Sequence, residues 1–460
     1  MLFSSMTFIS LFLPIVLGIY YLLPKIFRNG FLLCASLIFY GWNDPKAVLI
    51  ILSIISISYI GAILMSQYPT YKKIFLIGAI LLNLEILLYY KYFNFILTNL
   101  NAAFNLNLPM QKIIMPIGIS FYTFQALSYL TDVFRQTVPA QKNPFKLALY
   151  ISLFPQLIAG PIIKYHDISA QLNFRSENLQ KIIYGFKRFI IGLSKKVLIA
   201  NTMGSICDQI FSQPVTQYDY QTAWLGTISY SLQLYYDFSG YSDMAIGLGM
   251  MFGFKFMENF NYPYCATSIS DFWHRWHISL STWFKEYLYI TLGGNHGTSG
   301  RTYLNLFIVF LITGIWHGAE WTFIVWGLWH GLFIIFEKIT GWNKPNSSPY
   351  IRLTQHFYTI LVFSLGWVFF RSPNLSYGYE YIRTLFGLQT PEICAYDILY
   401  YLDTTEFIAL FFGLLFTTPI ARNILNKPHI SVNISLIILF ILSISSIAAS
   451  SYNPFIYFRF

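Results

Sequence analysis

The chain has 460 residues; its 29 basic and 19 acidic residues make only 10% of it charged, whereas 56% is hydrophobic. A soluble globular domain carries roughly 25% charged residues, so the composition excludes an ordinary soluble enzyme, a disordered chain and a fibrous repeat. The net charge of +10 does not indicate nucleic-acid binding, because excess Lys and Arg is typical of cytoplasmic loops. We predict a polytopic protein that contacts membrane lipid and no nucleic acid.

Apolar runs follow one another along the chain without the alternation of a β-barrel, which predicts an all-α fold. At roughly 20 residues per span, the length allows about 10–13 transmembrane helices, in one integral domain over residues 1–460. The first run, 1–24, has no cationic segment before it and no cleavage site, so we expect a retained span rather than a signal peptide. The other runs lie near 30–42, 46–67, 74–93, 113–131, 146–163, 181–200, 221–236, 243–256, 301–319, 322–340, 355–370, 404–421 and 434–451.

Basic residues predict the orientation of these spans. The stretch 164–196 is rich in Lys and Arg and contains only Asp167 and Glu177 as acids, so we expect it to be cytoplasmic. Lys25 and Arg28 place the end of the first span inside and the N-terminus outside. The last run then carries the C-terminus outward.

Residues 235–340 contain polar groups within apolar sequence. Asp237 and Asp243 are six residues apart, or about 240° around a helix, so they point to different faces. We expect each to pair with a neighbouring span as a structural anchor. The stretch 271–286 is too polar to cross lipid and too aromatic for a free loop, which predicts a re-entrant or interfacial helix with His274 and His277 on one face.

No metal site and no bound cofactor are predicted. The four cysteines lie far apart without a CxxC pair, and His274 and His277 lack further ligands or an HExxH motif. His317 lies near the end of a deeply apolar run, where an ionisable group is costly and therefore a functional candidate. Histidine is also readily tuned for proton transfer near neutral pH. For His330 we favour a core histidine bonded to a backbone carbonyl.

Six ordered blocks of this sequence resemble the membrane-bound O-acyltransferase (MBOAT) family, in its bacterial cell-envelope branch. The blocks span most of residues 1–340, and together they make the resemblance specific. They are 1–5 with FYGW at 39–42, MPIGISFYTFQ at 115–125, FPQLIAGP at 154–161, YDFSGYSD at 236–243, FWHRWHISLS at 272–281 and GIWHG at 314–318.

The resemblance implies acyl transfer from a cytoplasmic thioester through a central membrane tunnel with re-entrant helices around it. His317 matches the family's catalytic histidine, and His277 matches a second recurrent histidine. A base that accepts the proton of an attacking hydroxyl contributes about 10²–10⁴-fold, which a histidine in a dry tunnel can supply. Tryptophans could wall the tunnel or simply pack in the core. They are Trp276, Trp316 and Trp321.

The implied donor is acetyl-CoA or an acylated carrier protein, and both bring phosphate that Lys and Arg bind. The densest cations of the cytoplasmic stretch are the candidates for donor binding, unless they only signal topology. They are Lys187, Arg188, Lys195 and Lys196.

The last residues, 451–460, are expected to form an extracytoplasmic tail. Their F-x-Y-x-x-F pattern, from Phe455 to Phe460, resembles a motif of some envelope acylation systems in which the tyrosine is proposed to hold the acyl group. Tyr457 is therefore a candidate acyl relay. The alternative is an aromatic anchor at the membrane interface, with Arg459 snorkelling.

These expectations describe a multi-pass O-acetyltransferase of the bacterial inner membrane. It would move acetyl groups outward to hydroxyls of an envelope glycan, such as peptidoglycan, an alginate-like polymer or another exopolysaccharide, through an extracytoplasmic SGNH-type partner. An alternative within the enzyme class is D-alanyl transfer to teichoic acid from a carrier-protein thioester. A different class, a secondary transporter or flippase, is favoured by polar residues and glycine breaks inside spans but not by any visible inverted repeat.

Overall fold

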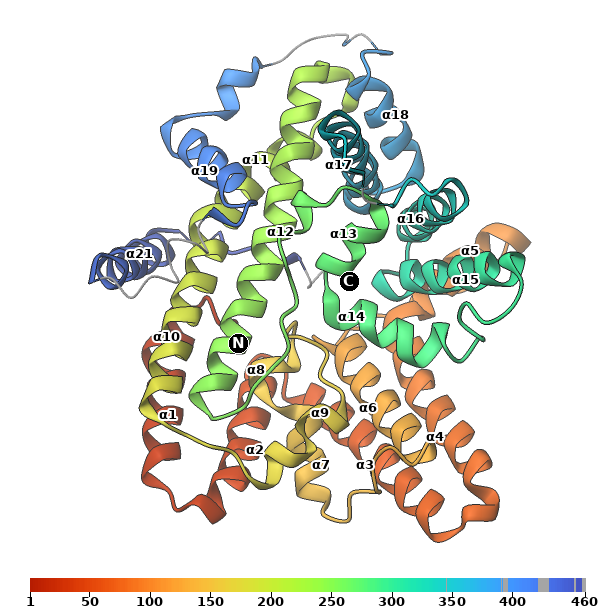
Figure 1. Ribbon diagram of the computed structural model, residues 1–460, viewed down its shortest axis with the longest axis vertical. Helices are drawn as coiled ribbons and strands as arrows, with labels where there is room; N and C mark the ends of the chain where they lie inside the picture. The colour runs from red at the N-terminus through yellow and green to blue at the C-terminus, as the bar shows by residue number, and fades with distance from the viewer. Residues whose placement is uncertain (345, 390, 392–395, 421–429, 451, 457–460) are drawn as a thin grey trace. The chain divides into compact units, whose positions relative to one another are not determined.

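The computed structural model describes residues 1–460 except 345, 390, 392–395, 421–429, 451 and 457–460, and the described part contains helices and no strand (Figure 1). The all-α prediction is confirmed. The chain forms two compact units, unit 1 with Met1–Phe189 and Ser242–Met257, and unit 2 with Ile190–Tyr241 and Glu258–Phe460. Two of the three unit boundaries fall inside α10 (Leu179–Ser194) and α12 (Tyr220–Met251), and the third follows Met257, after the end of α12. The organisation as one integral domain stays a prediction.

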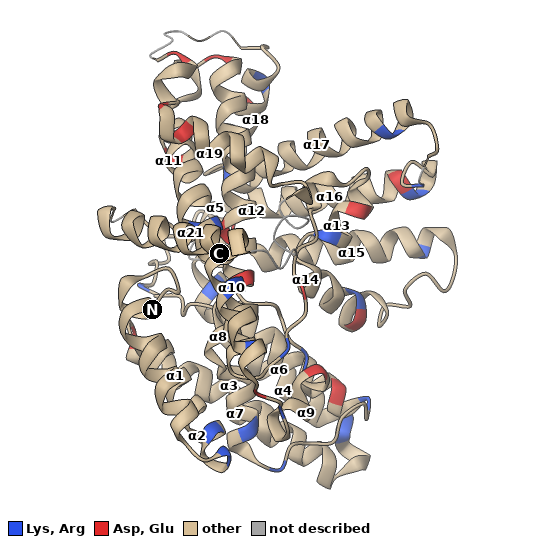
Figure 2. Ribbon diagram, turned by 60° about the vertical axis from the view of Figure 1, so that its left-hand side comes forward, with Lys and Arg blue, Asp and Glu red and all other residues tan. Residues whose placement is uncertain are grey.

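Six helices among the described residues are long and apolar enough to cross a membrane, and each coincides with a predicted apolar run. Figure 2 shows most Lys, Arg, Asp and Glu at helix ends and connections rather than along these helices. The protein is therefore a multi-pass membrane protein. The six are Pro45–Gln67, Pro69–Phe104, Leu179–Phe211, Trp321–Thr340, Pro349–Arg371 and Ile430–Ala449.

Six is fewer than the predicted 10–13 spans, because several apolar runs form shorter or more polar helices. The runs 221–236 and 243–256 join into the single 32-residue helix α12. The run 146–163 is interrupted at Leu153, whose non-helical backbone separates α7 from α8, where Pro155 favours a new helix start. The full span number and the central tunnel stay predictions.

Unit 1 begins its helices at recognisable sequence signals. Asp44 accepts a hydrogen bond from the Lys46 N–H at 3.0 Å, with Pro45 at the first helical position, and Asn143 with Pro144 repeats this arrangement. The helices are α1 (Leu13–Leu22), α2 (Lys25–Gly41), α3 (Pro45–Gln67), α4 (Lys72–Leu87), α5 (Phe93–Phe104), α6 (Ile119–Phe134), α7 (Pro144–Ser152), α8 (Phe154–Leu157) and α9 (Tyr165–Asn173).

A partly buried carboxylate ties the middle of unit 1 to its first two helices. Glu177 forms an ion pair with Arg28 and accepts a hydrogen bond from the Tyr20 hydroxyl. Its other cationic neighbour is Arg175, whose Nε lies 3.6 Å from a Glu177 oxygen. The carboxylate charge is thus balanced inside unit 1.

Unit 2 contains the histidines singled out by the sequence. Its helices, besides the later part of α10 and most of α12, are α11 (Asn201–Phe211), α13 (Ile269–Arg275), α14 (Ile278–Trp283), α15 (Ser299–His317), α16 (Trp321–Thr340), α17 (Pro349–Arg371), α18 (Leu375–Leu385), α19 (Thr404–Leu415) and α21 (Ile430–Ala449). Two π-helical turns extend neighbouring helices: η4 (Lys195–Ala200) and η7 (Phe284–Tyr289).

Helices α15 and α16 pack along one another at a pair of glycines. A Cβ on Gly314 would lie 2.5 Å from the Phe323 carbonyl oxygen, and a Cβ on Gly327 would lie 2.5 Å from the Phe310 carbonyl oxygen. Only the absence of both side chains lets the two backbones approach so closely, as small residues do between membrane helices. This contact lies one turn before His317.

Candidate active site

His317 is the last residue of α15 and is buried. Its ring contacts three aromatic rings, with centroid distances of 4.9 Å to Trp316, 4.7 Å to Trp326 and 5.3 Å to Phe370. The helix ends here because Gly318 adopts an extended conformation, and any Cβ on it would meet the Phe323 ring at 2.2 Å. The aromatic contacts hold the His317 imidazole in a water-poor environment.

His277 lies at a break between two short helices. α13 ends at Arg275, Trp276 is extended, and His277 has a left-handed backbone with φ of 44° before α14 begins. The prediction that His274 and His277 share one helical face is therefore wrong. His274 is exposed, with its Nδ1 2.6 Å from the Ser270 carbonyl oxygen, whereas His277 is buried.

The break is held by the chain segment around Asn259, which takes over hydrogen bonds that a continuous helix would make. The Ile278 N–H donates to the Asn259 carbonyl at 3.0 Å, and the Ser279 hydroxyl donates to the Asn259 side chain at 2.9 Å. The Asn261 N–H donates to the Arg275 carbonyl at 2.9 Å. A left-handed non-glycine residue is a strained conformation that persists where its surroundings fix it, often at functional sites.

Trp316 connects the two predicted histidines. Its ring centroid lies 6.4 Å from that of His277 and 4.9 Å from that of His317. Phe238 of α12 also packs on His277, with 4.5 Å between the two ring centroids. Residues 40 positions apart in sequence are thus gathered at one indole, which supports a shared site.

The other two predicted tunnel tryptophans differ in their surroundings. Trp276 is buried in an aromatic cluster, 5.1 Å from both Phe260 and Trp367. Trp321 is the first residue of α16 and is 52% exposed, so the protein does not enclose it. Whether any of these rings walls a tunnel stays a prediction.

His330 is fully buried among tryptophans, with ring distances of 5.2 Å to Trp273, 5.3 Å to Trp326 and 6.1 Å to Trp367. The favoured hydrogen bond to a backbone carbonyl is absent, since neither ring nitrogen has a partner in the described part of the chain. The expectation of a core histidine holds, but ring packing rather than a carbonyl fixes it.

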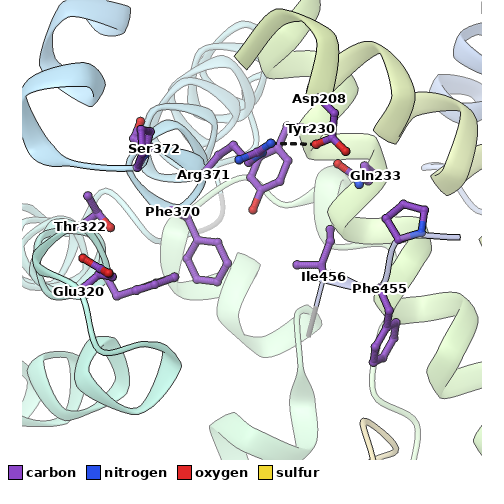
Figure 3. Close-up of a pocket in the computed structure, with 13 residues that line it drawn as sticks. Asp208, Tyr230, Gln233, Glu320, Thr322, Phe370, Arg371, Ser372, Phe455 and Ile456 are labelled. Atoms are coloured by element: carbon purple, nitrogen blue, oxygen red, sulfur yellow. Dashed lines mark hydrogen bonds and ion pairs between the residues drawn. The ribbon is translucent and has the colours of Figure 1, made fainter. Parts of the chain in front are cut away.

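A cavity of about 280 Å³ lies within unit 2 (Figure 3), and one residue of its wall contacts His317. Phe370, which contacts the His317 ring, forms part of its wall, and Glu320 follows His317 by three residues. Burial raises the pKa of the Glu320 carboxyl above its ordinary value. The wall combines aromatic, hydroxyl and charged groups: Asp208, Tyr230, Gln233, Glu320, Thr322, Phe323, Phe370, Arg371, Ser372, Pro373, Pro454, Phe455 and Ile456.

An ion pair in this wall was not predicted from the sequence. Arg371 Nη2 lies 2.8 Å from Asp208 Oδ1, as the dashed line in Figure 3 shows. The sequence did contain a sign of this pair: Arg371 ends the apolar helix α17, and Asp208 interrupts the apolar helix α11. Ionisable residues within membrane helices are functional candidates by default.

Asp237 and Asp243 each pair with a cation of a neighbouring helical segment. Within unit 1, Arg188 Nη2 lies 2.6 Å from Asp243 Oδ1. Within unit 2, Lys196 Nζ lies 2.8 Å from Asp237 Oδ1, and both side chains are 2% exposed. Arg188 and Lys196 are thus engaged in ion pairs, whereas Lys187 and Lys195 are partly exposed. Donor binding by these four cations stays a prediction.

Comparison with known proteins tests the resemblance directly. The model of the MBOAT family, the membrane-bound O-acyltransferases, matches residues 34–370, which include His277 and His317. The chain belongs to the membrane-bound O-acyltransferase family. It is therefore an acyltransferase, and the predicted family is confirmed.

Named relatives of this acyltransferase modify envelope polymers. The probable alginate O-acetylase AlgI of Azotobacter vinelandii is 38% identical, with both chains covered in full. The peptidoglycan O-acetyltransferase of Helicobacter pylori is 36% identical over 86% of this chain and 81% of its own. The teichoic acid D-alanyltransferase of Bacillus subtilis is 28% identical over 51% of this chain and 62% of its own.

Two remaining predictions about this acyltransferase are not tested by the described residues. Tyr457 lies outside the described residues, although Pro454, Phe455 and Ile456, shortly before it, line the cavity. The described residues contain no group of three or more His, Cys, Asp or Glu that could hold a metal. The absence of a metal and of a bound cofactor stays a prediction.

Proposed function

We propose that this acyltransferase moves an acetyl group from a cytoplasmic thioester to hydroxyls of a cell-envelope glycan, with His317 as general base. The observation that carries the proposal is the buried His317, beside a cavity and linked to His277 through Trp316. The O-acetylating relatives, which cover most or all of the chain, support acetyl as the group and a glycan such as alginate or peptidoglycan as the acceptor.

In this proposal neutral His317 accepts the proton of the attacking hydroxyl. The hydroxyl oxygen forms a bond to the thioester carbonyl carbon, the carbon–sulfur bond breaks, and the leaving thiolate takes up a proton. Proton transfer of this kind contributes about 10²–10⁴-fold. The aromatic rings around His317 support the role, because they exclude water from the imidazole.

Tyr457 is the proposed first acceptor. A phenol has an ordinary pKa near 10 and is protonated at neutral pH, so it requires a base, and its ester is a reactive donor for a second hydroxyl. The described residues just before it support this role, because Phe455 and Ile456 are buried and line the cavity next to His317. The acyl-tyrosine would then pass its group to the glycan.

The finer details of topology are part of the same proposal. We place the protein in the bacterial inner membrane with both termini outside, and the thioester donor, acetyl-CoA or an acyl carrier, on the basic cytoplasmic side. An SGNH-type acyltransferase outside would receive the acetyl group. The Lys and Arg residues near span ends, such as Lys25, Arg28 and Lys181, support this orientation, whereas Lys196 lies within the span-length helix Leu179–Phe211 and is not counted among them.

The test is replacement of His317 by Ala, with thioester consumption and glycan acetylation measured in membranes. We expect a loss of about 10²-fold or more, and a loss below about 10-fold would be too small for a general base. His274→Ala is the matched control, because His274 is an exposed histidine on α13, and it should retain normal activity.

The same membranes separate the other functions. Turnover with a D-alanyl carrier thioester but not with acetyl-CoA would favour D-alanyl transfer, which the weaker teichoic acid relative performs by name. Transport of a glycan precursor without thioester consumption, unaffected by His317→Ala, would favour a transporter or flippase.

A further inference from the structure

The buried Lys196–Asp237 pair contacts the main chain of a segment more than 200 residues away. Lys196 Nζ donates to the Pro454 carbonyl oxygen, 258 residues away, and also to Asn201 Oδ1 at 2.8 Å. Asp237 Oδ1 lies 2.8 Å from Lys196 Nζ, while its Oδ2 accepts a hydrogen bond from the Ile456 N–H at 2.9 Å, 219 residues away. Both Lys196 and Asp237 therefore take part in the ion pair and also form a hydrogen bond to the main chain of the distant segment.

Neighbouring contacts fix the same segment, residues 452–456. The Phe455 ring packs 4.9 Å from the Tyr241 ring. The Tyr452 hydroxyl donates to Asp208 Oδ2 at 2.7 Å, and Asp208 Oδ1 pairs with Arg371 in the cavity wall. The segment is thus held from Tyr452 to Ile456 by groups of α11, η4 and α12.

We infer that Lys196 and Asp237 form a main-chain clamp that holds residues 454–456 in the wall of the cavity beside His317. They are positioning residues, because they contact the chain rather than a substrate. Pro454 has no N–H, so its carbonyl is its only polar main-chain group, and the lysine satisfies it. A main-chain N–H or carbonyl left unpaired in this buried place would be costly.

The chemistry favours a clamp over a purely structural ion pair. A buried ion pair by itself adds little stability and can often be replaced by packed apolar residues. Here both partners bring hydrogen bonds to main-chain groups, which are the strong, charge-assisted kind. Any consequence of the clamp for catalysis rests on the proposed role of Tyr457.

The clamp is tested by the accessibility of a cysteine placed at Ile456, which is 7% exposed. A membrane-compatible thiol reagent is applied to the full chain carrying Ile456→Cys, and the chain without the added cysteine is labelled in parallel to subtract the native thiols. In Lys196→Met/Asp237→Leu, packed apolar residues replace the pair. We expect labelling to accelerate about tenfold or more, because charge-assisted hydrogen bonds are lost.

A charge swap, Lys196→Asp/Asp237→Lys, isolates the main-chain contacts. The swapped pair can still attract, but an aspartate at 196 cannot donate to the Pro454 carbonyl and a lysine at 237 cannot accept from the Ile456 N–H. We expect labelling as fast as in the apolar variant. Glu177→Gln is the control, since it weakens a partly buried ion pair of unit 1, and labelling there should stay slow.

Unchanged labelling in the folded apolar variant, or restored protection in the swap, overturns the clamp whatever the activity. Acyl transfer measured in the same variants addresses the separate question. We expect kcat to fall about tenfold or more. Fast labelling with normal acyl transfer would keep the clamp and remove the proposed relay through Tyr457.

Discussion

Substitution of Gly314 by Ala tests whether the α15–α16 contact positions His317, the proposed general base. The new methyl group would lie 2.5 Å from the Phe323 carbonyl oxygen and 3.2 Å from the Gly327 Cα. Favourable contacts lie at about 3.5–4.0 Å, and a backbone carbonyl cannot rotate away as a side chain can. The two helices must therefore separate by roughly 1 Å near the end of α15.

The expected effect has two parts. Overpacking of this kind costs about 1–3 kcal/mol of folding free energy. His317 follows Gly314 by less than one helical turn, so its ring moves with the helix. Misplacement of a catalytic group by about 1 Å can lower the rate about 10²-fold. We expect kcat to fall by about 10–100-fold while most of the protein remains folded.

The assay is acyl transfer by purified protein, with thermal unfolding measured in the same detergent. Gly300→Ala is the matched control, because Gly300 lies on the same helix and a Cβ added to it would have no heavy atom within 4 Å. It should be neutral or slightly stabilising. If Gly314→Ala and Gly300→Ala differ less than about twofold in kcat, the close approach does not position His317.

Three further predictions concern other substitutions. His277→Gly should be more stable than His277→Ala by about 1 kcal/mol, measured by thermal unfolding, because glycine accepts the left-handed backbone that alanine resists; equal stability would contradict the strain. Trp316→Ala should destabilise by about 3–5 kcal/mol in unfolding assays, whereas Trp321→Ala, at a half-exposed position, should cost far less. Charge reversal at Lys187 and Lys195 should raise the donor KM in acyl-transfer kinetics, and an unchanged KM with normal insertion would leave these cations only a topological role.

Local sequence patterns were enough to predict the helical fold, and the histidine motifs made His277 and His317 candidates for the site. Each of the six span-length helices coincides with an apolar run, and the GIWHG block led to His317. The break at His277 was missed, because a single left-handed non-glycine residue leaves no periodic signal. It depends on hydrogen bonds from Asn259, a neighbour brought in by folding.

Pairing between distant charges was also only partly predictable. The sequence indicated that Asp237 and Asp243 need partners, yet nothing local identified Lys196 and Arg188 as those partners. Lys196 and Arg188 were also predicted to bind the donor. A cluster of cations in the sequence does not reveal whether each cation binds a phosphate or pairs with an aspartate. Arg371 in the cavity wall was overlooked because it ends an otherwise ordinary apolar helix.

The long separation between the Lys196–Asp237 pair and its main-chain partners has a consequence for biosynthesis. Ribosomes add about 5–20 residues per second, so the 219 to 258 residues between the partners correspond to roughly 10–50 s of translation. Throughout this interval the nascent chain contains both charges without the carbonyl and the N–H that complete their hydrogen bonds. In a chain that stalls before residue 454, Lys196 and Asp237 therefore cannot form their hydrogen bonds to the main chain of Pro454 and Ile456.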